Sequence, residues 1–131
     1  MTVRVNVLPS GLLDELVVSD CDFEIRRTGQ AKYRLTARPD PADPYVVDLW
    51  TSKLGTIKTV VRDIEAWVTV YMDADGSLRI LRAADCGLHL EQMTRGNYWM
   101  GLDRADSHVH VNMSTSGYLK ARIVNPGDDA S

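Results

Sequence analysis

Residues 67–82, with the sequence WVTVYMDADGSLRILR, decide the fold class of this chain. On both sides of Asp75-Gly76, apolar and polar residues alternate, which is the period of a strand with one buried face. An Asp-Gly pair readily adopts the positive φ angles that a tight hairpin turn needs. The stretch therefore predicts a β-hairpin with strands over 67–72 and 77–82.

The same alternation extends along most of the chain, with turn residues between the segments. Further strands are predicted at 2–8, 22–26, 32–38, 45–50, 88–93, 98–102, 108–113 and 118–124. Many short strands at this spacing favour a curled antiparallel sheet, a barrel or a sandwich.

Two segments have apolar residues at helical spacing. Residues 12–18 follow Ser10, a candidate N-cap, and place Asp14 and Glu15 in a first turn. Residues 56–66 carry Ile57, Val60, Val61 and Ile64, although this β-branched run also suits a strand. We favour a short helix there. The predicted class is α+β, predominantly antiparallel β, with one or two short helices.

Composition limits the function classes. A chain of 131 residues with 44% apolar and 25% charged residues predicts one globular domain over 1–131, with a polar tail at 125–131. A net charge of -3 argues against nucleic acid or an anionic membrane as partner. No apolar run is long enough to cross a bilayer, and the N-terminus alternates instead of forming a signal-peptide core. With Cys21 and Cys86 expected as reduced thiols, we expect a cytoplasmic protein.

The histidines offer one candidate metal site. His108 and His110 would project from the same face of a strand and could hold zinc if a third ligand arrived from elsewhere. The candidate third ligands are His89, Cys86, Asp85 and Asp106. The simpler interpretation, that these histidines belong to the polar face of a strand, is favoured, and we expect no cofactor.

Cys86 and His89 raise the question of a thiolate nucleophile. Three positions apart on a strand, they would lie on opposite faces, so a buried cysteine beside a turn glycine is the preferred interpretation. The sequence therefore favours a protein that is not an enzyme.

Charge is segregated along the first forty residues. The charges between Val5 and Ile25 are all negative and those between Ile25 and Pro39 are all positive. The carboxylates Asp14, Glu15, Asp20, Asp22 and Glu24 could form an acidic patch that attracts a basic partner. Alternatively, Asp22 and Glu24 pair across strands with Arg34 or Arg38.

Aromatic residues give a second indication of binding. Tyr98 and Trp99 lie in a segment with bulky side chains on both faces, so one side is a candidate interface anchor. The competing interpretation is that such residues fill the core of a small β domain.

These features favour a small cytosolic binding or inhibitor protein that occludes a partner protein through an acidic and aromatic surface, as immunity proteins do. One alternative is a small β-barrel enzyme, metal-dependent through His108 and His110. Another is a subunit of a phage particle or a homo-oligomer whose sheet edges pair.

Overall fold

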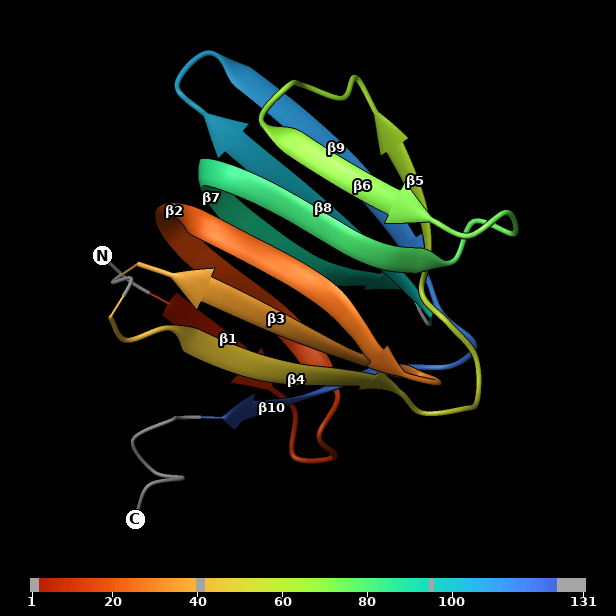
Figure 1. The fold of residues 1–131 in the computed structure, drawn as a ribbon. Coiled ribbons are helices and arrows are strands. Elements are labelled where there is room, and N and C mark those ends of the chain that lie inside the picture. Colours follow the sequence, from red (N-terminus) through yellow and green to blue (C-terminus); the bar gives the residue numbers. More distant parts are fainter. Residues whose placement is uncertain (1–2, 40–41, 95, 125–131) are drawn as a thin grey trace.

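The computed structural model describes residues 3–39, 42–94 and 96–124, and these form a mostly antiparallel β-sheet of ten strands. The strands are β1 (Val3–Val7), β2 (Leu13–Gly29), β3 (Lys32–Arg38), β4 (Tyr45–Thr51), β5 (Lys58–Arg62), β6 (Val68–Met72), β7 (Leu78–Thr94), β8 (Asn97–Arg104), β9 (Ser107–Ser114) and β10 (Leu119–Val124). Figure 1 shows their succession. The predicted antiparallel sheet is confirmed. The predicted tail at 125–131 lies outside the described residues.

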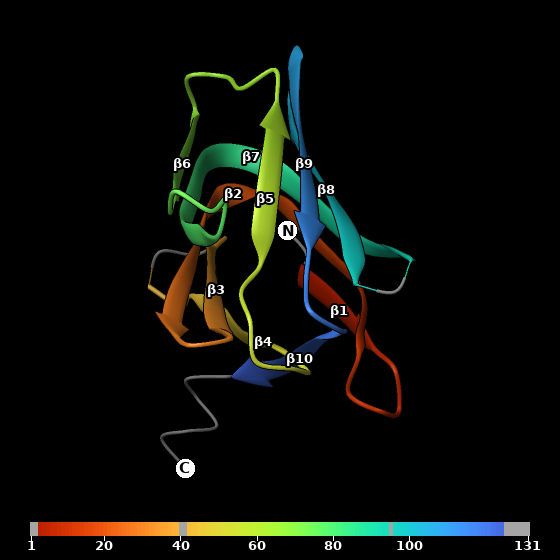
Figure 2. The same ribbon diagram turned by 90° about the vertical axis from the view of Figure 1, so that its right-hand side faces the viewer.

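The two long strands, β2 and β7, organise the sheet. They pair with each other along most of their length and arch from one side of the molecule to the other (Figure 2). The arch divides the sheet into two layers. The β3 layer contains the C-terminal half of β2, the N-terminal half of β7, and β3, β4, β6 and β10. The β8 layer contains the opposite halves of β2 and β7, with β1, β8, β9 and β5.

The arch bends where Cys21 faces Cys86 across the β2–β7 pair, because the register shifts on both sides of Cys21. On β7 the bend is taken by Asp85, which has a φ of 52°. Asp22 stabilises this conformation, since its Oδ1 accepts a hydrogen bond of 2.8 Å from the Asp85 amide. The sequence predicted separate strands at 77–82 and 88–93, but a strand that bends without breaking joins them.

Both outer strands of the sheet reach the opposite layer. At one edge, Lys120 of β10 bridges to Leu12, and the Ala121 amide donates to the Gly11 carbonyl at 3.2 Å. At the other edge, Lys58 of β5 bridges to Ser77, the residue before β7. These contacts close the two layers around one core.

The predicted helices are wrong, because the described residues contain strands and no helix. Leu13 and Leu16 both face the core at a spacing of three because Asp14 is the extra residue of a β-bulge, where the register with β1 shifts. A bulge thus reproduces helical spacing within a strand.

The part of the chain that the structure describes contains no helix long and apolar enough to span a membrane.

The segment 56–66 contains strand β5, which pairs with β9. Ile57 and Thr59 face the core, whereas Val60 is 57% exposed and Ile64 is 58% exposed. The apolar residues at helical spacing therefore do not share one buried face. The β-branched composition of this segment was the better indicator of its secondary structure, a strand.

Candidate functional site

The outer face of the β8 layer carries two rows of side chains that come from six strands. The strand register places Asn6, Glu15, Glu91, Trp99, Asn112 and Val60 in the first row. It places Arg4, Val17, His89, Gly101, His110 and Arg62 in the second row. Residues far apart in the sequence therefore meet on one sheet face.

Trp99 lies at the centre of this face. Its indole ring occupies the space above Gly101, where a Cβ would come within 2.6 Å of the Trp99 Cη2 atom. The ring is flanked by the two cross-strand neighbours of Gly101. The His89 ring meets it edge-on with centroids 5.8 Å apart, and the His110 ring lies 5.5 Å away at a tilt of 58°. Three aromatic rings thus form a row across β7, β8 and β9.

Glu15, His89 and Glu91 meet beside this row. His89 Nε2 lies 3.0 Å from Glu15 Oε2 and 3.7 Å from Glu91 Oε2. The other oxygen of Glu15, Oε1, accepts from Arg4 Nη2 at 3.3 Å and from Asn6 Nδ2 at 3.4 Å. The hydrogen bond with His89, assisted by the charge of Arg4, lowers the pKa of the Glu15 carboxyl.

His108 and His110 share one outward face, as predicted, but have different neighbours. His108 Nδ1 lies 2.6 Å from Asp103 Oδ1, whereas His110 contacts Trp99. Among the described residues, the group of three or more metal-ligating side chains is Glu15, His89 and Glu91, so the structure does not bring a third ligand to the predicted pair.

None of the four predicted third ligands joins His108 and His110 in a group of metal-ligating side chains among the described residues. His89 is on the same face as His110, but the Trp99 ring lies between the two. Cys86 is buried, Asp85 lies in the bend of β7, and Asp106 lies in the turn between β8 and β9.

The five predicted partner-binding carboxylates do not form one patch. Glu15 lies on the outer face of the β8 layer and Asp14 in the bulge beside it. Asp20 lies at the bend of the long strands, and Asp22 and Glu24 lie on the outer face of the β3 layer. The arch of β2 separates residues that are close in sequence.

Glu24 is neutralised within the β3 layer, although not by the predicted partners. Its carboxylate accepts from Arg26 Nε at 2.7 Å and from Arg82 Nε at 2.8 Å. Hydrogen bonding to Arg26 is the largest cause that holds the pKa of Glu24 below its ordinary value, and Arg82 adds to it. Arg34 instead pairs with Asp48 at 2.9 Å. The strand register does place Asp22 opposite Arg38.

Tyr98 is a core residue, so it cannot serve as an exposed anchor. Its side chain is 2% exposed, and its hydroxyl donates to the Leu119 carbonyl at 3.3 Å. Trp99, the next residue on β8, points the opposite way and is half-buried on the outer face. Alternation along one strand thus separates the two predicted aromatic anchors.

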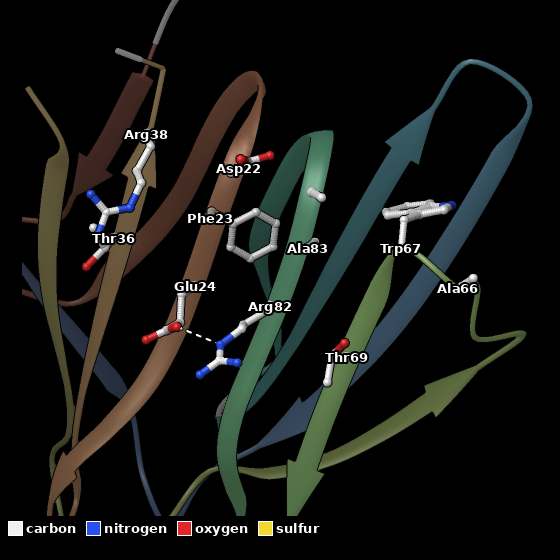
Figure 3. A pocket seen from close by; sticks show the side chains of 11 residues that line it. Asp22, Phe23, Glu24, Thr36, Arg38, Ala66, Trp67, Thr69, Arg82 and Ala83 are labelled. Atoms are coloured by element: carbon white, nitrogen blue, oxygen red, sulfur yellow. Dashed lines mark hydrogen bonds and ion pairs between the residues drawn. The ribbon is translucent and has the colours of Figure 1, made fainter. Parts of the chain in front are cut away.

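The outer face of the β3 layer has an open hollow of about 460 Å³ (Figure 3). Glu24 and Arg82 point toward each other there, and Trp67 stands at the far side. The Trp67 Nε1 donates to Ser107 Oγ at 2.9 Å, and the Arg104 guanidinium lies 5.2 Å from the ring centroid. Because Glu24 is held ionised between two guanidiniums, it is poorly suited to donate or accept a proton in catalysis.

The two cysteines are expected to resist thiol reagents in the folded protein. Cys21 is 6% exposed and Cys86 is fully buried, and burial raises the pKa of Cys86 from 9.0 to about 12. At pH 8 the thiolate is therefore scarce and inaccessible. Ellman's reagent should label neither thiol in the native protein and both in guanidinium chloride; rapid native labelling would contradict this burial.

The same shift predicts the effect of alkaline pH on stability. A thiol with a raised folded pKa binds its proton more tightly in the folded state, so its stabilisation is complete below pH 9 and is lost as the pH rises toward 12. The structure thus supports a structural cysteine over the nucleophile considered for Cys86 and His89.

Eight residues of the two rows were not selected as site residues from the sequence: Arg4, Asn6, Val17, Val60, Arg62, Glu91, Gly101 and Asn112. The mid-strand Gly101 is a sequence signal that could have found one of them, since a glycine within a strand often marks a close approach by another group. Comparisons with models of protein families, with curated proteins and with solved structures gave no match.

Proposed function

We propose that this protein binds a partner protein through the outer face of the β8 layer, centred on Trp99, and acts by occluding the surface that it covers. The observation that carries the proposal is the fixed position of Trp99 between His89 and His110 on an open sheet face. Aromatic side chains are the commonest interface anchors. An anchor already held in place loses less conformational entropy on binding.

The charges of the two outer faces support a partner with a basic surface. The outer face of the β3 layer carries the cations Arg26, Lys32, Arg34, Arg38, Arg82, Lys120 and Arg122, beside Asp22, Glu24 and Asp48. The β8-layer face presents Glu15 and Glu91 together with Arg4 and Arg62 beside the aromatic row, so its charges balance and it is less positive than the β3-layer face. Such an asymmetry repels a basic partner from one face and steers it toward the other.

Site-specific photo-crosslinking in cells of the source organism tests which face is used. A photoreactive phenylalanine at Asn112, beside Trp99 in the first row, should give an adduct with a basic protein. The same residue at Tyr71, which is 54% exposed on β6 of the other layer, is the matched control. An adduct from position 71 and none from position 112 would refute the proposal.

Replacing Trp99 with alanine should weaken binding of the crosslinked partner by about 30-fold, the effect of losing an interface hot spot of about 2 kcal/mol. The Trp50→Ala variant is the control, because Trp50 lies on the outer face of the β3 layer beside Lys32 and Lys120. Binding is measured with the purified partner by calorimetry, after circular dichroism shows that both variants fold. Equal losses in the two variants would contradict a site at Trp99.

A further inference from the structure

The side chains of Glu15, His89 and Glu91 form a mixed imidazole and carboxylate group whose geometry is suited to a metal ion. One donor atom from each residue lies within 4.8 Å of the other two. In a tetrahedral zinc site with bonds of about 2.0–2.2 Å, donor atoms lie about 3.4 Å apart. The two distances from His89 Nε2, 3.0 Å and 3.7 Å, lie on either side of that value.

The strand register explains why these groups converge. Glu15 of β2 lies directly opposite Glu91 of β7, and His89 shares the outward face two residues before Glu91. Like charges directly opposite each other in a sheet are destabilising. Arg4 offsets part of this repulsion at Glu15, and a divalent cation between the carboxylates would offset it for both.

Two of the three ligands are already oriented by neighbours. Arg4 and Asn6 engage Oε1 of Glu15, which leaves Oε2 directed at His89. The His89 ring is held edge-on against Trp99. Partners of this kind, which bind a ligand rather than the metal, fix ligand orientation in metal sites. The Glu91 side chain is 38% exposed, and its Oε2 already lies 3.7 Å from His89 Nε2.

We propose that Glu15 Oε2, His89 Nε2 and Glu91 Oε2 bind one zinc ion on the outer face of the β8 layer. A nitrogen ligand favours zinc over magnesium or calcium, which prefer oxygen alone. The side chains are 28–38% exposed, so the fourth position is open to water or to a group from another molecule. This site is distinct from the His108 and His110 pair, and it requires no bound partner.

Isothermal titration calorimetry of the full-length protein with ZnCl₂ tests the site. We expect one equivalent of zinc to bind and to raise the melting temperature, and Co²⁺ to give the visible absorption of a protein-bound ion. Binding should persist in a hundredfold excess of Mg²⁺. Absence of stoichiometric binding, or displacement by Mg²⁺, would overturn the proposal.

Variants distinguish this site from the other histidines. Loss of a residue that supports a ligand lowers metal affinity about 10–100-fold, so loss of the direct ligand in His89→Ala should lower it at least about 100-fold. Glu91→Gln should also weaken binding. His108→Ala is the matched control, because His108 is exposed on the same face and pairs with Asp103.

Each outcome decides the assignment. Unchanged binding in His89→Ala, or an equal loss in His108→Ala and His110→Ala, would overturn it in favour of the other pair. Circular dichroism excludes unfolding as the cause of a loss. Because the titration uses no partner protein, zinc binding and the proposed partner binding succeed or fail independently.

Discussion

Replacing Leu90 with alanine should lower the free energy of unfolding by about 2–5 kcal/mol, the cost of a cavity in a packed core. Leu90 is fully buried on β7 and lies between Leu16 of β2 and Met100 of β8. The surrounding strands are fixed by hydrogen bonds on both sides, so the cavity cannot readily close. This is a large share of the about 5–15 kcal/mol by which typical domains are stable.

Urea unfolding followed by tryptophan fluorescence measures this loss. Met93→Ala is the matched control, because Met93 lies on the same strand and is 61% exposed. It should change the free energy of unfolding by less than about 0.5 kcal/mol. A Leu90→Ala effect as small as that of Met93→Ala would show that the core is not packed as described.

Removing the hydroxyl of Tyr98 should cost about 1–3 kcal/mol, because it leaves buried polar groups without partners. The Tyr98 hydroxyl accepts from the Leu119 amide at 3.0 Å and donates to the Leu119 carbonyl at 3.3 Å. It thereby ties β8 to β10, which belongs to the opposite edge of the sheet. The loss in Tyr98→Phe is expected even though the aromatic ring and its packing remain.

The matched control is Tyr71→Phe, since Tyr71 is 54% exposed on β6. Thermal and urea unfolding of both variants should show a loss in Tyr98→Phe alone. Hydrogen exchange adds a local measurement, because the Leu119 amide should lose protection when the tyrosine hydroxyl is absent. Full protection of that amide in Tyr98→Phe would contradict the assigned hydrogen bond.

The antiparallel strands could be predicted wherever apolar residues alternated with polar ones, as in the hairpin over 67–82. The prediction failed where a bulge changed the phase. Leu13 and Leu16 both face the core only because Asp14 is inserted between them, which imitates a helical period. Similarly, Asp85 bends β7 without ending it, and a bend and a turn have the same residue signature.

The candidate site was only partly predictable. Glu15 and Trp99 were selected from the sequence as partner-binding residues and His110 as a candidate metal ligand, but the sequence did not place the three side by side. Their meeting depends on the pairing of β2 with β7, and of β8 with both β7 and β9. The alternation within one strand predicts the face on which a side chain lies. It does not predict which other strand pairs with that strand.

The sequence by itself determined the period-two pattern, and hence the strands outside 12–18 and 56–66, the tight turn at Asp75-Gly76 and the shared face of His108 and His110. Only the tertiary structure decided that β2 and β7 arch between two layers and carry Glu15 and Glu24 to opposite faces. It also decided that His89, and not His108, meets two carboxylates. The physical reason is that alternation is a local property of the chain, whereas register and curvature arise from contacts between strands distant in sequence.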